Sequence, residues 1–316
     1  MSVKSLLRVL GAVGESYVPI FRPPRHEHTE SSRYCYSVWL RHLVMAYEKN
    51  LTQSIPGVVA ELGPGKSLGT LLAALISGAQ TCYAFDVVQH FGKKRNQKIF
   101  DELIELFGRR EDIPDEDELP RVKPFLKSYR FPSYILTDEH LKEMLSKVRL
   151  NTIRNSLACM RGATGNNTPI SYRIPWDNSH VLAESSVDMI YSQAVMEHVD
   201  DVRFAYETMY RWLRNGGFVS HQIDFKCHGT ATEWSGHWSY SDRAWKLIRG
   251  SRRYFINRLP HSAHIHLLEQ NGFKVVSDIK VEERRGVERG RLAKEFRCLC
   301  DEDLKTSGAF IQAVKR

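Results

Sequence analysis

The stretch from residue 58 to residue 86 constrains the fold more than any other part of this sequence. The apolar run at 58–60 is short and is followed by the turn Gly63-Pro64-Gly65, which is the profile of a buried parallel strand. A helix is predicted over 67–77 and a second apolar strand over 81–85. Together these make a βαβ unit, and sheets built from such units bind nucleotide-like ligands at the carboxyl edge of their strands.

Two phosphate-binding patterns fit the glycine turn poorly. A GxxxxGK[ST] loop ending in Gly65-Lys66-Ser67 needs a glycine five residues before its last glycine, where the chain has Ala60. The dinucleotide fingerprint GxGxxG fits at Gly63 and Gly65, but Leu68 stands at the place of its third glycine. The turn therefore disfavours a phosphate and a pyrophosphate ligand, although it does not exclude the second.

The acidic residue before the turn suggests a third ligand. Glu61 stands two residues before the first glycine, and the run 61–65 resembles the first motif of class I methyltransferases that depend on S-adenosyl-L-methionine (SAM). SAM has an ammonium group and a ribose diol but no phosphate. Asp86, at the end of the second predicted strand, is placed to accept hydrogen bonds from both ribose hydroxyls.

The fourth-strand region resembles the same superfamily more specifically. Residues 185–201 contain a D-x-I/V run, with a predicted strand at 187–191, followed by Glu-His-Val. A helix at 202–213 and a strand at 218–225 then follow as expected. The resemblance implies an α/β, Rossmann-like fold with a seven-stranded, mostly parallel sheet.

The chain divides into an arm, a main domain and an insertion. Residues 1–30 are rich in proline and charge, and we interpret them as an irregular arm. The predicted SAM-binding domain comprises 31–92 and 169–316. Residues 93–168 separate the second strand from the third by far more than a usual connection, and helical apolar spacing is found within them at 97–107 and 138–160. We interpret 93–168 as a helical subdomain that acts as a substrate lid or an oligomer contact.

Composition indicates a globular protein of the cytoplasm. Of the 316 residues, 42% are hydrophobic and 26% charged, and no apolar run is long enough to span a bilayer. The six cysteines form no CxxC pair, which favours reduced thiols over disulfides or a zinc knuckle. The net charge of +8 is dispersed, and it indicates either a slight preference for acidic substrates or a solvated surface.

In the family, the cofactor lies across the carboxyl ends of the first, second and fourth strands. The resemblance implies that Gly63, Pro64 and Gly65 approach the methionine part. It places Glu61 near the ammonium group and Asp86 on the ribose.

Adenine is usually held after the third strand of the family's sheet, where this chain has Trp176 and Asp177. Trp176 would stack on the ring, unless it is a core residue, and Asp177 would accept from the exocyclic amine. Gln193 and Ala194, after the fourth strand, are expected to contact the cofactor through their backbone.

Methyl transfer is an in-line displacement, so the enzyme must align the acceptor and, for a hydroxyl, remove its proton. The candidate bases are Asp224, His228, His198 and His221. His221 and Asp224 face opposite sides of a strand, and Asp224 has the better position, with His228 beside it. His198 has an alternative role, in which its ring bonds a backbone carbonyl. Asp224 and His228 also suit a divalent ion, but their spacing is weak evidence and no metal site is predicted.

The acceptor is the least explicit part of the sequence. The segments SHQIDFKCH, NRLP at 257–260 and SGAFIQAVK resemble a subgroup of bacterial methyltransferases of polysaccharide or glycoconjugate biosynthesis. This resemblance implies that Arg258 binds the acceptor and that Trp234 and Trp238 stack on sugar rings, with hydrophobic packing as the alternative for the tryptophans. We therefore expect O-methylation of a sugar or another small hydroxylated acceptor, by a monomer or a homodimer.

Two other functions remain open at this stage. The basic charge fits a nucleic-acid methyltransferase, but the chain has no appended RNA-binding module, no N/D-P-P-Y/F tetrad and no Pro-Cys nucleophile after the fourth strand. A methyltransferase-like binding or scaffold protein is the second alternative. The intact glycine and acidic positions argue against it.

Overall fold

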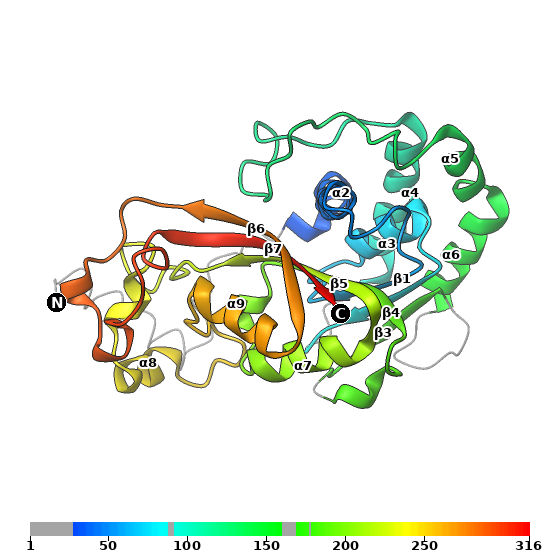
Figure 1. Cartoon of the computed structure of the whole chain (residues 1–316). Coiled ribbons are helices and arrows are strands. Elements are labelled where there is room, and N and C mark those ends of the chain that lie inside the picture. The colour runs from blue at the N-terminus through cyan, green and yellow to red at the C-terminus, as the bar shows by residue number, and fades with distance from the viewer. Residues whose placement is uncertain (1–27, 88–91, 160–168, 177) are drawn as a thin grey trace.

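A seven-stranded sheet forms the centre of the molecule (Figure 1). The computed structural model describes residues 28–87, 92–159, 169–176 and 178–316. The strand order is β3-β2-β1-β4-β5-β7-β6, and β7 runs antiparallel to both its neighbours while the other pairs are parallel. The strands are β1 (Val58–Leu62), β2 (Thr81–Phe85), β3 (Ile170–Arg173), β4 (Val187–Gln193), β5 (Leu213–Asp224), β6 (Phe273–Glu282) and β7 (Thr306–Lys315). The predicted Rossmann-like class I fold is confirmed.

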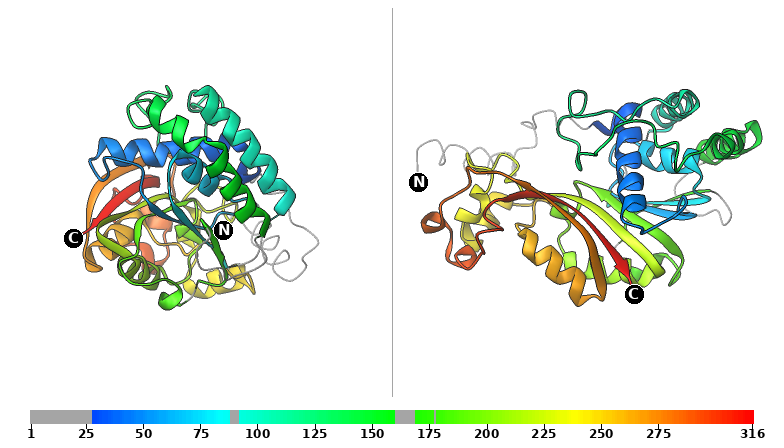
Figure 2. Two further views of the ribbon diagram at one scale, coloured as in Figure 1. Left: turned by 90° about the vertical axis from the view of Figure 1, so that its right-hand side faces the viewer. Right: turned by 45° about the horizontal axis from the view of Figure 1, so that its top comes forward.

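Helices cover both faces of this sheet (Figure 2). The helices are α2 (Ser32–Glu48), α3 (Gly69–Ser77), α4 (Lys93–Arg109), α5 (Asp138–Met144), α6 (Lys147–Cys159), α7 (Val202–Trp212), α8 (Asp242–Arg249) and α9 (His261–Gln270). One hydrophobic core joins the sheet to α2 through α6, and a second joins it to α7 and α9. Each face of the sheet is therefore buried, as a parallel sheet requires.

The predicted βαβ unit lies at the middle of the sheet. All nine residues of α3 are buried, so this apolar helix fills the space between β1, β2 and α2. The parallel register pairs Leu62 with Phe85 and also with Ser192 of β4. Gln193 in turn pairs with Gln222 of β5. The carboxyl ends of these four strands thus meet along one edge.

The helical spacing at 97–107 lies within α4, and the helical stretch expected at 138–160 is divided into two helices, α5 and α6. Leu145 ends α5, and the carbonyl of Ser146 accepts the first hydrogen bond of α6, from Leu150. Serine competes with helical backbone bonding and favours helix starts, so it supports a break within the apolar pattern. Residue 160 lies outside the described part of the chain.

The connection between α4 and α5 is irregular, and Arg41 of α2 holds it in place. The Arg41 side chain is fully buried. Its guanidinium donates to the carbonyls of Pro114, Val122 and Pro124 at 2.7, 3.1 and 2.6 Å. These bonds satisfy both the buried cation's donors and the loop's carbonyls. The described part of the insertion therefore packs on the α2 and α3 face, and its role as lid or oligomer contact stays a prediction.

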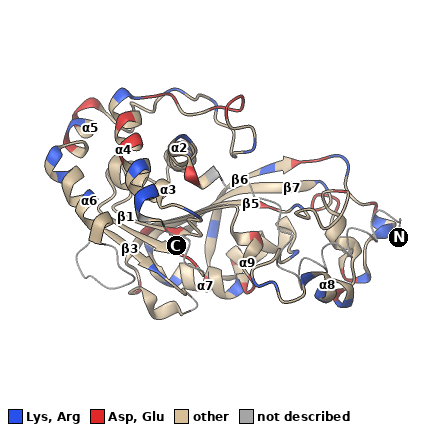
Figure 3. Cartoon of the chain, turned by 180° about the vertical axis from the view of Figure 1, so that it is seen from behind, with Lys and Arg blue, Asp and Glu red and all other residues tan. Residues whose placement is uncertain are grey.

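Among the residues that the structure describes, Lys, Arg, Asp and Glu are scattered over the elements and form no single basic block (Figure 3). In the described part of the chain, no helix has the length and apolarity needed to cross a membrane.

Candidate active site

A cavity of about 330 Å³ opens at the carboxyl edge of the sheet. Four residues that the sequence singled out line it: Gly63, Asp86, Trp176 and His198. They follow β1, β2, β3 and β4 respectively, so the parallel sheet brings together residues far apart in sequence. The volume is within the range of small-molecule sites.

Glycine is required at the turn after β1. Gly63 has φ of +64°, and a Cβ at this position would lie 2.6 Å from Cγ2 of Val195. Gly65 has φ of +70° and packs against Thr29, whose Oγ1 accepts a hydrogen bond from the Lys66 amide at 3.2 Å. The positive φ disfavours a side chain at both positions, and the close approach of Val195 also excludes one at Gly63.

Two buried carboxyls belong to the ends of β1 and β2: Asp86 lines the cavity, whereas Glu61 does not. Burial raises the pKa of Glu61 to about 8, and the neighbouring Asp86 adds to the rise. Oε2 of Glu61 has no hydrogen-bond partner among the described residues. Oδ1 of Asp86 accepts from the amide of Val87 at 2.7 Å, which orients the carboxylate at the end of β2. A ligand that carries an ammonium group and hydroxyls fits these two acceptors.

Some of the other predicted cofactor contacts line the cavity and others do not. Trp176 lines the cavity and is 8% exposed, whereas Asp177 lies outside the described residues. Gln193 directs its amide oxygen to the His42 ring at 3.2 Å, and the Ala194 amide donates to the Gln222 carbonyl. Neither Gln193 nor Ala194 lines the cavity; Val195, the next residue, does.

Three of the four candidate bases come together beside the cavity. The His198 and His228 ring centroids are 5.1 Å apart, and Nε2 of His228 lies 3.3 Å from Oδ2 of Asp224. Nδ1 of His198 bonds the carbonyl of Tyr254 at 3.0 Å, so this ring both bonds a backbone carbonyl and lines the cavity.

His221 lies apart from this group. Its ring is fully buried, with Nδ1 2.8 Å from the Ser192 hydroxyl, and burial lowers its pKa to about 3. A neutral, enclosed imidazole of this kind is a poor proton acceptor. The structure therefore does not place His221 with the other candidate bases.

Asp224 remains ionised. Burial pushes the pKa of Asp224 upward, but His228 and the Lys226 amide and ammonium outweigh this effect, and the pKa lies below its ordinary value. An aspartate with a lowered pKa is a weak base by itself. Its carboxylate is better suited to orient the adjacent imidazole and to stabilise its positive charge.

The prediction missed Glu197. This side chain is 3% exposed, and neither of its carboxylate oxygens has a hydrogen-bond partner among the described residues. Burial raises the pKa of Glu197 well above its usual range, and Asp224 adds to the rise. The only sequence signal was its place in the Glu-His-Val motif directly before His198.

Asn257 holds the turn that carries Glu197 and His198. Its amide donates to the Glu197 carbonyl at 2.8 Å, and its side-chain Nδ2 donates to the carbonyls of Met196 and Val199 at 2.8 and 3.0 Å. Asn257 was not among the predicted site residues, although it belongs to the NRLP segment that suggested Arg258.

Strained backbone surrounds the same group. Ala194, His228, Tyr254 and Arg258 all have positive φ, between 46° and 67°. Such conformations cost energy for residues other than glycine and are frequent at functional sites. Their concentration at one end of the sheet supports a functional role for this region.

The predicted acceptor residues are packed side chains. The Arg258 guanidinium pairs with Asp242 and lies over the rings of Trp245 and Phe296, 4.8 and 4.7 Å from their centroids. Its side chain is 6% exposed.

Trp234 and Trp238 are likewise buried among other side chains. Trp238 is fully buried and donates from its indole nitrogen to the Arg258 carbonyl, while Trp234 is 8% exposed. The structure gives no geometric basis for contacts between these three side chains and a sugar.

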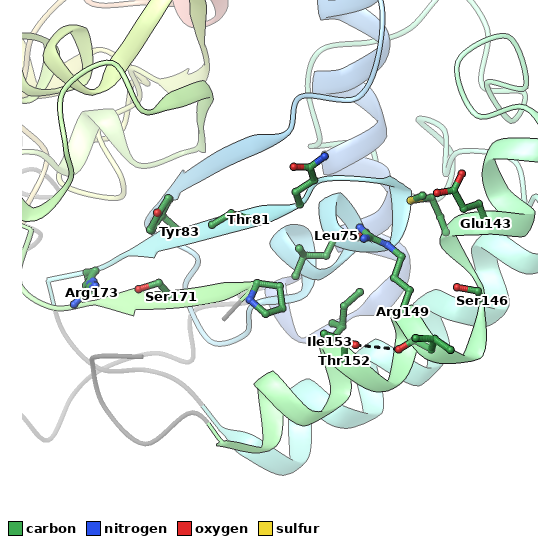
Figure 4. A pocket seen from close by; sticks show the side chains of 14 residues that line it. Leu75, Thr81, Tyr83, Glu143, Ser146, Arg149, Thr152, Ile153, Ser171 and Arg173 are labelled. Atoms are coloured by element: carbon green, nitrogen blue, oxygen red, sulfur yellow. Dashed lines mark hydrogen bonds between the residues drawn. The ribbon is translucent and has the colours of Figure 1, made fainter. Parts of the chain in front are cut away.

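A larger cavity, of about 980 Å³, lies away from these residues, between α6 and the edge strand β3 (Figure 4). Arg149 on its wall donates to the carbonyls of Leu75 and Ala79 at 2.9 and 2.7 Å. This guanidinium therefore caps the carboxyl end of α3. The cavity contains none of the predicted site residues, and we do not assign the active site to it.

Comparisons with known proteins found one family model and a number of solved structures. Residues 141–220 match the family model of a methyltransferase domain. No curated protein matches the chain. Solved structures similar to it include an S-adenosylmethionine dependent methyltransferase from Mesorhizobium loti, with 13% identity, coverage of 84% of this chain and 95% of the other, and a TM-score of 0.38. SAM-dependent methyltransferases from Methanosarcina mazei are also similar, with 12% identity, coverage of 84% and 95%, and a TM-score of 0.42.

The strand order of the sheet and the match to a methyltransferase domain support the same fold and activity. The chain therefore has a Rossmann-like class I methyltransferase fold and is a transferase whose cofactor is S-adenosyl-L-methionine.

Proposed function

We propose that this protein transfers a methyl group from SAM to a hydroxyl oxygen of a small acceptor, such as a sugar. The observation that carries this proposal is the group formed by Asp224, His228 and His198 at the border of the cavity. Proton removal is needed for a hydroxyl acceptor, and an imidazole next to a carboxylate is a common arrangement for it.

The cofactor is proposed to bind at the carboxyl edge. Gly63, Pro64 and Gly65 would contact its methionine part, with Glu61 near the ammonium group. Asp86 would bind the ribose hydroxyls, and Trp176 would stack on the adenine. The buried position of both carboxyls strengthens such hydrogen bonds, because water competes little there.

When bound, SAM supplies an electrophilic methyl group on its sulfonium. The acceptor oxygen forms a bond to the methyl carbon as the carbon–sulfur bond breaks, and that electron pair stays on sulfur. The hydroxyl proton leaves through the Asp224 and His228 pair. Asn257 positions His198 by holding its turn, and Tyr254 fixes the orientation of the His198 ring through its carbonyl.

A sugar is proposed as the acceptor because of the sequence resemblance to methyltransferases of polysaccharide biosynthesis. The net charge of +8 also favours an acidic acceptor, such as a sugar nucleotide with its phosphates. No macromolecular acceptor is needed to explain the site.

The proposal is tested by incubating the protein with methyl-labelled SAM and a panel of sugar nucleotides. We expect a labelled methyl ether in at least one product. Asp224→Asn should keep SAM affinity within about twofold and lower turnover by roughly 10²- to 10⁴-fold. Asp101→Asn, at an exposed position on α4, is the matched control and should keep full turnover.

Two results would contradict the proposal. Transfer to amine acceptors with none to hydroxyl acceptors would exclude O-methylation. Full turnover in Asp224→Asn would remove Asp224 from proton removal.

A further inference from the structure

Glu197, His198 and His228 form a compact group of metal-ligating side chains. One carboxylate oxygen of Glu197 and one ring nitrogen of each histidine lie within 4.8 Å of one another. Glu197 and His198 belong to the short helix η3 (Met196–His198) after β4, and His228 follows β5. The group therefore forms where two neighbouring parallel strands end, and His198 also lines the cofactor cavity.

The Glu197 carboxyl is buried without a compensating partner in the described part of the chain. Its exposed fraction is only 3%, and neither oxygen has a hydrogen-bond partner among the described residues. A buried polar group without a partner is costly, and a buried charge more so. A bound cation would compensate the carboxylate directly.

The two imidazoles are held as metal-binding histidines usually are. Nδ1 of His198 bonds the Tyr254 carbonyl, so in the neutral ring it carries the hydrogen and the lone pair lies on Nε2. Nε2 of His228 faces the Asp224 carboxylate at 3.3 Å, which places the lone pair on Nδ1. Histidines that bind metals commonly give their other nitrogen to a carbonyl or a carboxylate.

We infer that Glu197, His198 and His228 bind a divalent transition-metal ion, with Asp224 and the Tyr254 carbonyl as the groups that orient the two rings. Two imidazoles and one carboxylate suit Zn²⁺, Mn²⁺, Fe²⁺ or Co²⁺ and disfavour Mg²⁺ and Ca²⁺, which prefer oxygen ligands. Bonds of about 2.1 Å place adjacent ligand atoms roughly 3 to 3.5 Å apart, so binding draws these side chains together by about 1 Å.

The role of this ion rests on the proposed function and sharpens it. An ion beside His198 is placed to bind the acceptor oxygen and to lower the pKa of its hydroxyl. In this arrangement His228 binds the ion and does not itself accept the proton, which instead leaves to solvent past Asp224, whose side chain is 33% exposed. His228 holds the ion in this arrangement, and Asp224 holds His228.

Metal binding can be measured without activity. Chelator-treated protein is titrated with Co²⁺ and followed by visible absorption, with Zn²⁺ as competitor. We expect one Co²⁺ per chain, and binding weaker by about tenfold or more in Glu197→Gln and His228→Asn. His228 is exposed and has φ of 46°, which asparagine tolerates, so its replacement tests the site without disturbing the core.

His266→Asn is the matched control, because His266 is an exposed histidine of α9 outside the group, and it should bind Co²⁺ like the parent protein. Absence of stoichiometric Co²⁺ binding, or unchanged affinity in both variants, would overturn the inference. Methyl transfer at full rate by metal-free protein would also overturn it and leave the proposed function standing. Co²⁺ binding without any methyl transfer would instead count against the proposed function alone.

Discussion

Replacing Gly63 by alanine tests how tightly the turn after β1 is built. The alanine would keep φ near +64°, a conformation that costs L-residues about 1–2 kcal/mol. Its Cβ would also lie 2.6 and 2.9 Å from the two γ-carbons of Val195. Overpacking of this kind costs roughly 1–3 kcal/mol.

Gly216→Ala supplies the matched control. Gly216 also has positive φ, +76°, but a Cβ there meets nothing within 4 Å. We therefore expect Gly63→Ala to lower the free energy of unfolding by about 2–5 kcal/mol and Gly216→Ala by about 1–2 kcal/mol. The difference between them isolates the contact with Val195.

Urea unfolding followed by circular dichroism measures both values. The double variant Gly63→Ala with Val195→Ala should be more stable than the sum of the single effects predicts, by roughly 1–3 kcal/mol. SAM affinity should fall in Gly63→Ala because Gly63 lines the cavity. Equal destabilisation by the two glycine replacements, or additivity in the double variant, would refute the steric argument.

Three further predictions concern Glu61, Arg258 and Asn257. Because folding raises the Glu61 pKa from 4.5 to about 8, the free energy of unfolding should fall as pH rises between these values. This fall should be smaller in Glu61→Gln, and an unchanged pH profile in that variant would contradict the prediction. Arg258→Ala should lower the free energy of unfolding by about 1–3 kcal/mol and leave SAM affinity unchanged; unchanged stability with a raised acceptor KM would restore its predicted role. Asn257→Ala should lower kcat more than SAM affinity, whereas equal losses would indicate a general structural defect.

The sheet and the glycine turn were predictable because their causes are local. The sequence pattern predicts β1, the glycine turn, the crossover helix and β2 from consecutive residues, because apolar runs and glycines follow one another there. The positions of Gly63 and Asp86 at the cavity followed from strand ends alone, since parallel strands share a carboxyl edge.

The remaining parts of the site depend on contacts between distant residues. In the sequence, nothing except its place in the Glu-His-Val motif separates Glu197 from an ordinary surface glutamate. Only the structure shows that its carboxyl is buried without a hydrogen-bond partner among the described residues. Trp238 and Arg258 resembled ligand contacts in sequence, but they pack on each other through an indole-to-carbonyl hydrogen bond. Such packing has no signature in a single stretch of chain.

We propose that the cavity at the carboxyl edge binds SAM, with Asp86 on the ribose. Calorimetric titration of the parent protein and Asp86→Asn with SAM and with S-adenosylhomocysteine tests it most directly. We expect saturable binding of one cofactor per chain, weakened by about 10- to 100-fold in Asp86→Asn, because a charge-assisted hydrogen bond contributes roughly 1.5–3 kcal/mol. No heat of binding for the parent protein, or equal affinities in the two proteins, would contradict the account.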